Sequence, residues 1–245
     1  MILAVIQARM GSTRLPGKVL KEINGKPLLS YQIDRLAYSE KIDKIVVATS
    51  DLARDDEIVD FCIANNIDYF RGSENDVLTR YFECASIHKP ETVVRLTADC
   101  PLCDPKIVDS VISKFQESGV DYCANTVPME TSCFPDGSDV EVFSMRALER
   151  ANSEVSDKHF REHVTFQFWQ DKGYKSTQLL GNKDYSKYRI TVDYPEDFEV
   201  VTYVFNELKR KGEFGHLNEV IDIIDSNDGI KSINSEYYFG QGWSK

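Results

Sequence analysis

Three basic side chains lie within ten residues of one another near the N-terminus. Arg9, Arg14 and Lys18 alternate there with glycine and hydroxyl residues, including Gly11 and Ser12. Guanidinium, ammonium and backbone N–H groups bind phosphate oxygens, and glycine lets the backbone approach such a ligand closely. A structural turn would explain the glycines but not the three cations. The spacing therefore predicts a phosphate-binding loop.

This segment differs from the two common glycine-rich nucleotide motifs. Five residues rather than four separate Gly11 from Gly17, and Val19 stands where a P-loop carries its magnesium-binding Ser or Thr. The dinucleotide pattern G-x-G-x-x-G does not fit either. We therefore expect a phosphate loop of another kind.

Acidic side chains follow two apolar stretches farther along the chain. Asp99 comes directly after the apolar stretch 92–97, and a carboxylate beyond the end of a buried strand suits Mg²⁺ coordination. Asp104 precedes a proline and is better interpreted as a helix N-cap. Asp193 repeats the arrangement of Asp99, since it follows an apolar stretch and precedes a proline-opened helix. We predict metal binding by Asp99.

Asp139 and Glu141 are two residues apart, so both point to one face of a predicted strand. Carboxylates that face a cleft accept hydrogen bonds from sugar hydroxyls. The alternative is an exposed strand face without a ligand. We keep both acids as candidate sugar-binding residues.

Two short motifs suggest metal or redox chemistry without supporting partners. His159 and His163 match the H-x-x-E-H zinc-peptidase pattern, but no third-ligand motif accompanies them. Cys100 and Cys103 form a C-x-x-C that lacks a second pair. We expect a site-lining or structural helix in the first case and reduced thiols on a loop in the second.

The elements that position these residues alternate regularly in the first half of the chain. Strands are predicted at 2–6, 44–49, 68–70 and 92–97, and helices at 27–37, 55–65, 76–87 and from 104 onward. Such alternation predicts an α/β fold, a Rossmann-like and mostly parallel sheet with helices on both faces. Ligands bind beyond the carboxyl ends of such strands, in loops that here begin at Gln7, Thr49 and Ala98.

The second half is less regular. A strand is predicted at 139–143, helices at 144–152 and 156–171, strands near 176–180 and 187–192, and helices from 195 and at 216–225. The C-terminal tail carries four aromatic residues, so we expect it to pack on the body. These residues are Tyr237, Tyr238, Phe239 and Trp243.

The composition narrows the class of partner. The 245 residues include 29 basic and 40 acidic side chains, a formal charge of −11. This argues against a nucleic-acid binder, although a few placed cations suffice for a small anionic substrate. No apolar run reaches the roughly 20 residues of a membrane span, and no basic leader precedes the apolar start. We expect a cytoplasmic protein without membrane or nucleic-acid partners.

The first loop carries a family resemblance. Its sequence, Q-A-R-M-G-S-T-R-L-P-G-K-V-L at 7–20, closely resembles the N-terminal signature of the sugar-activating cytidylyltransferases. That family includes the enzymes that activate 3-deoxy-manno-octulosonate and the acylneuraminates, and the nearest resemblance is to its SpsF-like branch of spore-coat polysaccharide biosynthesis. The resemblance implies that the loop wraps the triphosphate of CTP. The residues it implies for this site are Ala8, Arg9, Gly11, Ser12, Arg14 and Lys18.

Further segments resemble motifs of the same family. The run at 70–80 is similar to the second signature of the branch and implies a place near the nucleotide for Arg80, although 73–76 alone would read as a helix start. The stretch 189–197 resembles the V-D-x-P-E-D motif, which implies that Asp193 joins Asp99 in binding Mg²⁺. An R-E-H-V-T run implies three residues that line the sugar pocket, namely Arg161, Glu162 and His163.

We therefore expect a single nucleotidyltransferase domain over 1–245 that transfers CMP from CTP to a sugar hydroxyl and releases pyrophosphate. The resemblance also implies a homodimer formed through a sugar-binding and dimerisation insertion at about 126–186. Asp139 and Glu141 supply no cation for the carboxylate of an ulosonic acid, which weakens that choice of sugar. The alternatives are a GT-A-type glycosyltransferase with a nucleotide-sugar donor, or a non-catalytic nucleotide-binding protein.

Overall fold

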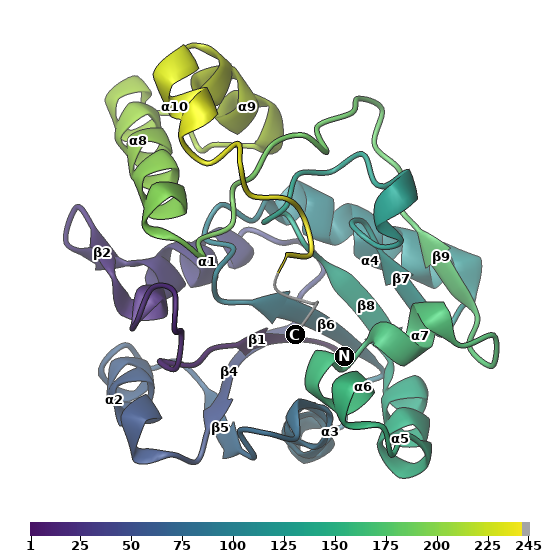
Figure 1. Cartoon of the computed structure of the whole chain (residues 1–245). Helices are drawn as coiled ribbons and strands as arrows, with labels where there is room; N and C mark the ends of the chain where they lie inside the picture. Colours follow the sequence, from purple (N-terminus) through teal and green to yellow (C-terminus); the bar gives the residue numbers. More distant parts are fainter. Residues whose placement is uncertain (242–245) are drawn as a thin grey trace.

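A seven-stranded β-sheet crosses the centre of the molecule in the computed structural model, which describes residues 1–241 (Figure 1). Its order is β5-β4-β1-β6-β8-β7-β9, and every neighbouring pair is parallel except those that involve β8. The strands are β1 (Ile2–Gln7), β4 (Lys44–Ser50), β5 (Tyr69–Gly72), β6 (Thr92–Thr97), β7 (Tyr122–Ala124), β8 (Glu141–Ser144) and β9 (Ser176–Gln178).

Helices cover both faces of this sheet because the side chains of a strand alternate in direction. Leu3 and Val5 of β1 pack against α3 (Val77–His88) and α5 (Met145–Glu154). Ala4 and Ile6 pack on the opposite face. The helices on that face are α1 (Leu28–Leu36), α2 (Asp56–Ala64) and α4 (Pro105–Ser118). The expected Rossmann-like α/β class is confirmed.

Three C-terminal helices form a third apolar cluster beside the sheet (Figure 1). They are α8 (Pro195–Lys211), α9 (Leu217–Asp225) and α10 (Asp228–Ile233), and the sequence did not predict α10. The tail packs on the body as expected, since the ring of Tyr237 stacks on that of Tyr194 at 3.9 Å between centroids. Trp243, which we expected to pack with it, lies outside the described residues.

Two predicted elements differ in the structure. The helix predicted at 156–171 is divided into α6 (Lys158–His163) and α7 (Phe166–Gln170) by Val164, whose φ of 59° is strained for a β-branched residue. The strand predicted at 187–192 is wrong: only Arg189 pairs, through an isolated bridge to Asp136. Residues 187–192 form no longer ladder because the segment beside them, which contains Asp136, is a loop rather than a strand.

The remaining elements are short. A hairpin of β2 (Glu22–Ile23) and β3 (Lys26–Pro27) follows the first loop, and 3₁₀ turns occupy Lys18–Leu20, Ala53–Asp55 and Met129–Thr131. All six cysteines are free thiols. Within residues 1–241, no helix has the length and apolar character needed to cross a membrane.

Candidate active site

A cleft opens at the carboxyl ends of β1 and β6, where two cavities of about 340 and 220 Å³ adjoin. The larger is called the basic lobe, and its lining includes Arg9, Gly11, Ser12, Thr13, Lys18 and Glu162. The smaller is called the acidic lobe, and its lining includes Arg95, Thr126, Asp136, Asp139, Glu141, Trp169, Arg189 and Gln241. Both lobes share Arg14, Thr97, Asp99, His163 and Asp193. The two predicted metal ligands therefore lie at the junction.

The buried carboxylate of Asp55 holds the first loop in place. Asp55 accepts the backbone N–H of Met10 at 2.7 Å, and Gly17, at a φ of 65°, closes the loop by donating to the carbonyl of Met10 at 3.2 Å. A Cβ on Gly11 would lie 3.0 Å from the guanidinium of Arg54. The glycines thus allow a tight loop that leaves its basic side chains facing the cleft.

Lys18 joins the two predicted metal ligands. Its side chain is nearly buried, and Nζ lies 2.9 Å from Oδ2 of Asp99 and 2.7 Å from Oδ1 of Asp193. Burial alone would lower the pKa of Lys18, but the two carboxylates outweigh it and raise that pKa. Burial likewise opposes ionisation of Asp99, but the ammonium group of Lys18 holds the pKa of Asp99 well below its usual range. Lys18 and Asp99 are therefore both charged at neutral pH.

Two arginines complete the surroundings of Asp193. Arg14 lies 3.2 Å from its Oδ1, with the guanidinium stacked 4.9 Å above the ring centre of Tyr194. Arg189 lies 3.2 Å from its Oδ2. Asp193 is therefore contacted by three cationic side chains, those of Arg14, Lys18 and Arg189.

A fully buried carboxylate, that of Asp197, fixes this arrangement. It accepts the backbone N–H groups of Asp193 at 2.9 Å and Tyr194 at 3.0 Å, and it pairs with Arg189 through Nε at 2.9 Å. It also accepts from the side chain of Asn234 at 2.9 Å. Asp197 therefore both lies in the first turn of α8 and orients the segment that carries Asp193. The N-cap expected at Asp104 is confirmed, since its side chain accepts from Lys106 N–H at 2.9 Å.

The donor set at the junction fits Mg²⁺. Asp99 and Asp193 offer hard carboxylate oxygens that both contact one cationic atom, so one small cation could contact both. The described part of the chain has no cluster of three or more His, Cys, Asp or Glu arranged to hold a metal, the histidine pair of α6 included. The remaining ligands would therefore come from phosphate oxygens and water, as is usual for Mg²⁺ in nucleotide sites.

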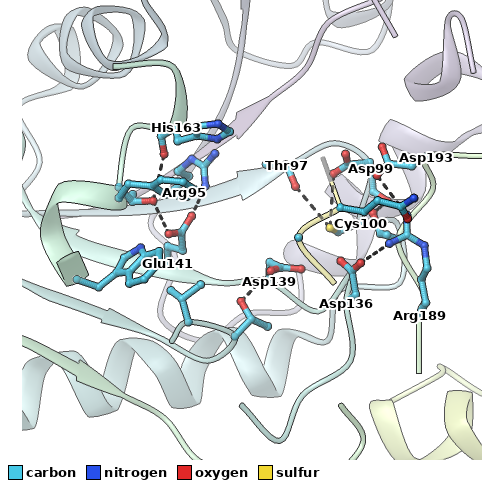
Figure 2. Close-up of a pocket in the computed structure, with 18 of the residues that line it drawn as sticks. Arg95, Thr97, Asp99, Cys100, Asp136, Asp139, Glu141, His163, Arg189 and Asp193 are labelled. Carbon is cyan, nitrogen blue, oxygen red and sulfur yellow. Dashed lines mark hydrogen bonds and ion pairs between the residues drawn. The ribbon is translucent and has the colours of Figure 1, made fainter. Parts of the chain in front are cut away.

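The acidic lobe contains a fixed and an available carboxylate (Figure 2). Glu141 accepts from Tyr122 and Thr165 hydroxyls, both at 2.5 Å, and pairs with Arg95, so its oxygens already have donors. Asp139 lies between this group and the junction, and within residues 1–241 it accepts only from the Thr126 hydroxyl at 2.7 Å and the Gly137 N–H at 2.9 Å. Only Asp139 of this expected pair is available to a sugar.

Gly137 brings the loop at 136–139 close to the metal site. Its φ is 101°, and a Cβ there would lie 2.2 Å from the backbone nitrogen of Thr191. Only glycine fits such an approach. It allows Asp136 to pair with Arg189 and places Asp139 beside the junction.

Some expected site residues lie away from both cavities. Arg80 is fully buried and donates to the carbonyl of Ser73 at 2.7 Å. Ala8 is buried and pairs with the backbone of β4. Arg161 binds Asp76 at 2.9 Å and the Thr79 hydroxyl at 2.6 Å, which ties α6 to α3. Neither arginine nor Ala8 lines a lobe, whereas Glu162 and His163 do.

Residues that sequence reasoning missed lie mainly in the acidic lobe. Arg95 is a charged residue inside an otherwise apolar strand, and that position was the available signal. Asp136 and Arg189 lie three and four residues from acids that we had selected, Asp139 and Asp193. Trp169 had no signal, because its position follows from the break at Val164.

Comparisons with known proteins place this cleft in a family. The cytidylyltransferase family profile matches residues 3–219. The spore coat polysaccharide biosynthesis protein SpsF of Bacillus subtilis is 32% identical over 234 residues, which cover 92% of this chain and 95% of that protein. A cytidylyltransferase structure from Leptospira borgpetersenii superposes with a TM-score of 0.83 at 30% identity, covering 97% of this chain and 98% of that chain.

The fold is also that of a more distant enzyme solved with nucleotide. The structure of CMP:2-keto-3-deoxy-manno-octonic acid synthetase complexed with CTP superposes with a TM-score of 0.61 at 16% identity, covering 84% of this chain and 98% of that chain. The profile match spans most of the chain, and SpsF matches over nearly its full length. The chain therefore belongs to the cytidylyltransferase family and is a nucleotidyltransferase.

Proposed function

We propose that this protein transfers CMP from CTP to a sugar hydroxyl and releases pyrophosphate, with Mg²⁺ held between Asp99 and Asp193. The observation that carries the proposal is the convergence of these two carboxylates on one point, at 2.9 and 2.7 Å from Lys18 Nζ. That point joins a basic lobe suited to a triphosphate to a lobe suited to a sugar.

The lobes assign positions to the reacting groups. Arg9, Arg14 and Lys18 would hold the phosphates in the basic lobe, and the leaving pyrophosphate would remain there. The sugar would lie in the acidic lobe with its hydroxyl directed at the α-phosphorus. Such positioning accounts for much of the rate in phosphoryl transfer. Bound Mg²⁺ would neutralise phosphate charge and acidify the attacking hydroxyl.

The experiment is a pyrophosphate-release screen with each of the four common nucleoside triphosphates, with Mg²⁺ or EDTA, against a panel of sugars. We expect release with CTP that depends on both Mg²⁺ and a sugar. Transfer of a sugar from a nucleotide-sugar donor would instead establish a glycosyltransferase. Binding of CTP without release for any sugar would establish a non-catalytic nucleotide-binding protein.

The assembly belongs to the same proposal: a cytoplasmic homodimer joined through residues 126–186, as the resemblance implies. Met129 and Leu180, two large apolar side chains exposed on the surface, both lie in that stretch. Light scattering coupled to size exclusion should give twice the chain mass. Introducing a charge at Leu180 should shift the mass toward that of one chain.

A further inference from the structure

The charges of the acidic lobe are paired with one exception. Glu141 pairs with Arg95, Asp136 pairs with Arg189, and the two junction aspartates pair with Lys18. Asp139 has no ion-pair partner within residues 1–241; its two hydrogen-bond donors, Thr126 and Gly137, are neutral. Burial, unrelieved by a nearby cation, raises the pKa of Asp139 to about 6.

The charge of each arginine in the lobe already has a carboxylate partner. Arg14, which both lobes share, pairs with Asp193 and is assigned to the phosphates. Arg95 could turn to an incoming carboxylate only by leaving Glu141, which the hydroxyls of Tyr122 and Thr165 hold in place. Arg189 is buried between Asp136 and Asp197. An acidic sugar would therefore add a negative charge to a lobe that already has an unpaired one, at a desolvation cost without compensation.

The lobe also has polar atoms suited to uncharged hydroxyls. Nε of Arg95, Nε1 of Trp169 and Oε1 of Gln241 are buried and make no hydrogen bond within the described chain. All three residues line this cavity. Buried polar atoms normally have partners, so these atoms indicate a ligand that carries both donors and acceptors. A sugar has both.

We propose that the acceptor is an amino sugar and that Asp139 binds its protonated amino group. This inference rests on the proposed function, because it assigns the substrate class of the same site. The ammonium group supplies the one charge that the lobe lacks. The hydroxyls of the sugar satisfy the unpaired polar atoms of Arg95, Trp169 and Gln241 in the same cavity. Asp139 thereby selects against the ulosonic acids that relatives of this family activate.

The test measures pyrophosphate release from CTP with Mg²⁺ for matched acceptors. The panel pairs 2-, 3-, 4- and 6-amino hexoses with their N-acetyl and hydroxyl counterparts, and adds 3-deoxy-manno-octulosonate and N-acetylneuraminate. We expect at least one free amine to have a kcat/KM about 10-fold or more above the values for its N-acetyl and hydroxyl counterparts, the effect of a charged hydrogen bond. Asp139→Asn should reduce that ratio to about 1 to 3. Thermal unfolding and CTP binding check that this variant is folded.

Each other outcome overturns a stated claim. If kcat/KM for an ulosonate or a neutral sugar equals or exceeds that for every amine, the amino-sugar inference fails and the proposed function stands. The same conclusion follows if Asp139→Asn keeps the wild-type ratio. Pyrophosphate release only with acceptors that carry no free amine would also overturn the inference and leave the proposed function standing. If no acceptor of any class causes release although CTP binds, the proposed function fails and the inference fails with it.

Discussion

The ammonium nitrogen of Lys18 lies 2.7 Å from Oδ1 of Asp193, a residue 175 positions farther along the chain. The same nitrogen lies 2.9 Å from Asp99. Lys18 thus stands between the two carboxylates that we propose as metal ligands. Because one cation excludes another from the same place, the lysine must move before a metal ion binds there. The phosphates of a bound nucleotide offer it a new partner.

Replacing Lys18 with methionine should open the metal site in the absence of nucleotide. The variant keeps an unbranched side chain, one atom shorter than that of lysine, and removes its charge. Mn²⁺ should therefore bind to the nucleotide-free variant about 10-fold more tightly or better, as expected for removing a close like charge. Electron paramagnetic resonance of free Mn²⁺ measures this without turnover. Lys21→Met serves as the control, because this neighbouring lysine lies over the ring of Phe198 and has no carboxylate partner within residues 1–241. Equal Mn²⁺ affinity in wild type and Lys18→Met would contradict the exclusion.

Neutralising Asp193 should abolish metal-dependent turnover in a folded protein. Asp193→Asn keeps the shape of the side chain but weakens a hard anionic ligand, so kcat should fall by about 100-fold or more. The rate of pyrophosphate release at saturating CTP and Mg²⁺ measures it. Glu199→Gln, an exposed acid on α8, the helix that begins two residues after Asp193, is the matched control. Retained turnover in Asp193→Asn would remove this residue from the metal site.

The buried carboxylate of Asp197 should matter most for stability. Asp197→Asn leaves Arg189 with an uncompensated part of its charge and disturbs two backbone hydrogen bonds that orient Asp193. Breaking one partner of a buried pair costs about 3 to 5 kcal/mol, and the remaining partners of Arg189 place our expectation near about 3 kcal/mol. Urea unfolding measures it, again against Glu199→Gln. A change below about 1 kcal/mol would show that Asp136 and Asp193 suffice for Arg189.

A substitution at Arg161 tests whether this residue has a structural role or lines the sugar pocket. Its guanidinium holds Asp76, Thr79 and the carbonyl of Val155, at distances of 2.6 to 2.9 Å. Arg161→Lys cannot keep this set, so the free energy of unfolding should fall by about 2 kcal/mol. Urea unfolding is the measurement, with Arg146→Lys, on the exposed side of α5, as the control. A raised KM for the sugar without a loss of stability would instead support the pocket role that the resemblance implied.

The parallel strands β1, β4, β5 and β6, and the carboxylate that follows β6, were predictable from sequence because both follow local rules. A buried parallel strand is a short apolar run, and the polar residue after it falls at the ligand edge of the sheet, which located Asp99. The pairing of Lys18 with Asp193 and of Arg189 with Asp136 was not predictable in this way. Those contacts depend on how distant segments pack, and no local pattern encodes them.

The break between α6 and α7 shows the same limit. Neither glycine nor proline marks Val164, and the periodicity of 156–171 suits one continuous helix. The hydroxyl of the next residue, Thr165, binds buried Glu141 at 2.5 Å, and its N–H turns back to the carbonyl of His163 at 2.5 Å. Tertiary contacts therefore override the helical pattern and bring His163 to the cleft.

His163 should make the folded protein sensitive to mild acid. Burial, and next the neighbouring His159, lower the pKa of its imidazole to about 4, against about 6.5 in an unfolded chain. Below pH 6.5 the unfolded state therefore binds more protons than the folded state, and stability falls as the pH decreases from 6.5 toward 4, while above pH 6.5 this contribution is complete. The His163 ring stacks on Phe166 with 4.4 Å between ring centroids, and His163→Phe keeps an aromatic ring there that does not titrate. The free energy of unfolding, measured in urea at pH 7 and pH 5, should decrease less in this variant than in wild type.

His159→Gln removes the neighbouring ring but not the burial, so the pKa of His163, followed by NMR, should rise while staying below 6.5. An NMR pKa near 6.5 in wild type, or the same loss of stability in wild type and His163→Phe, would show that the imidazole is solvated rather than buried against the cleft wall.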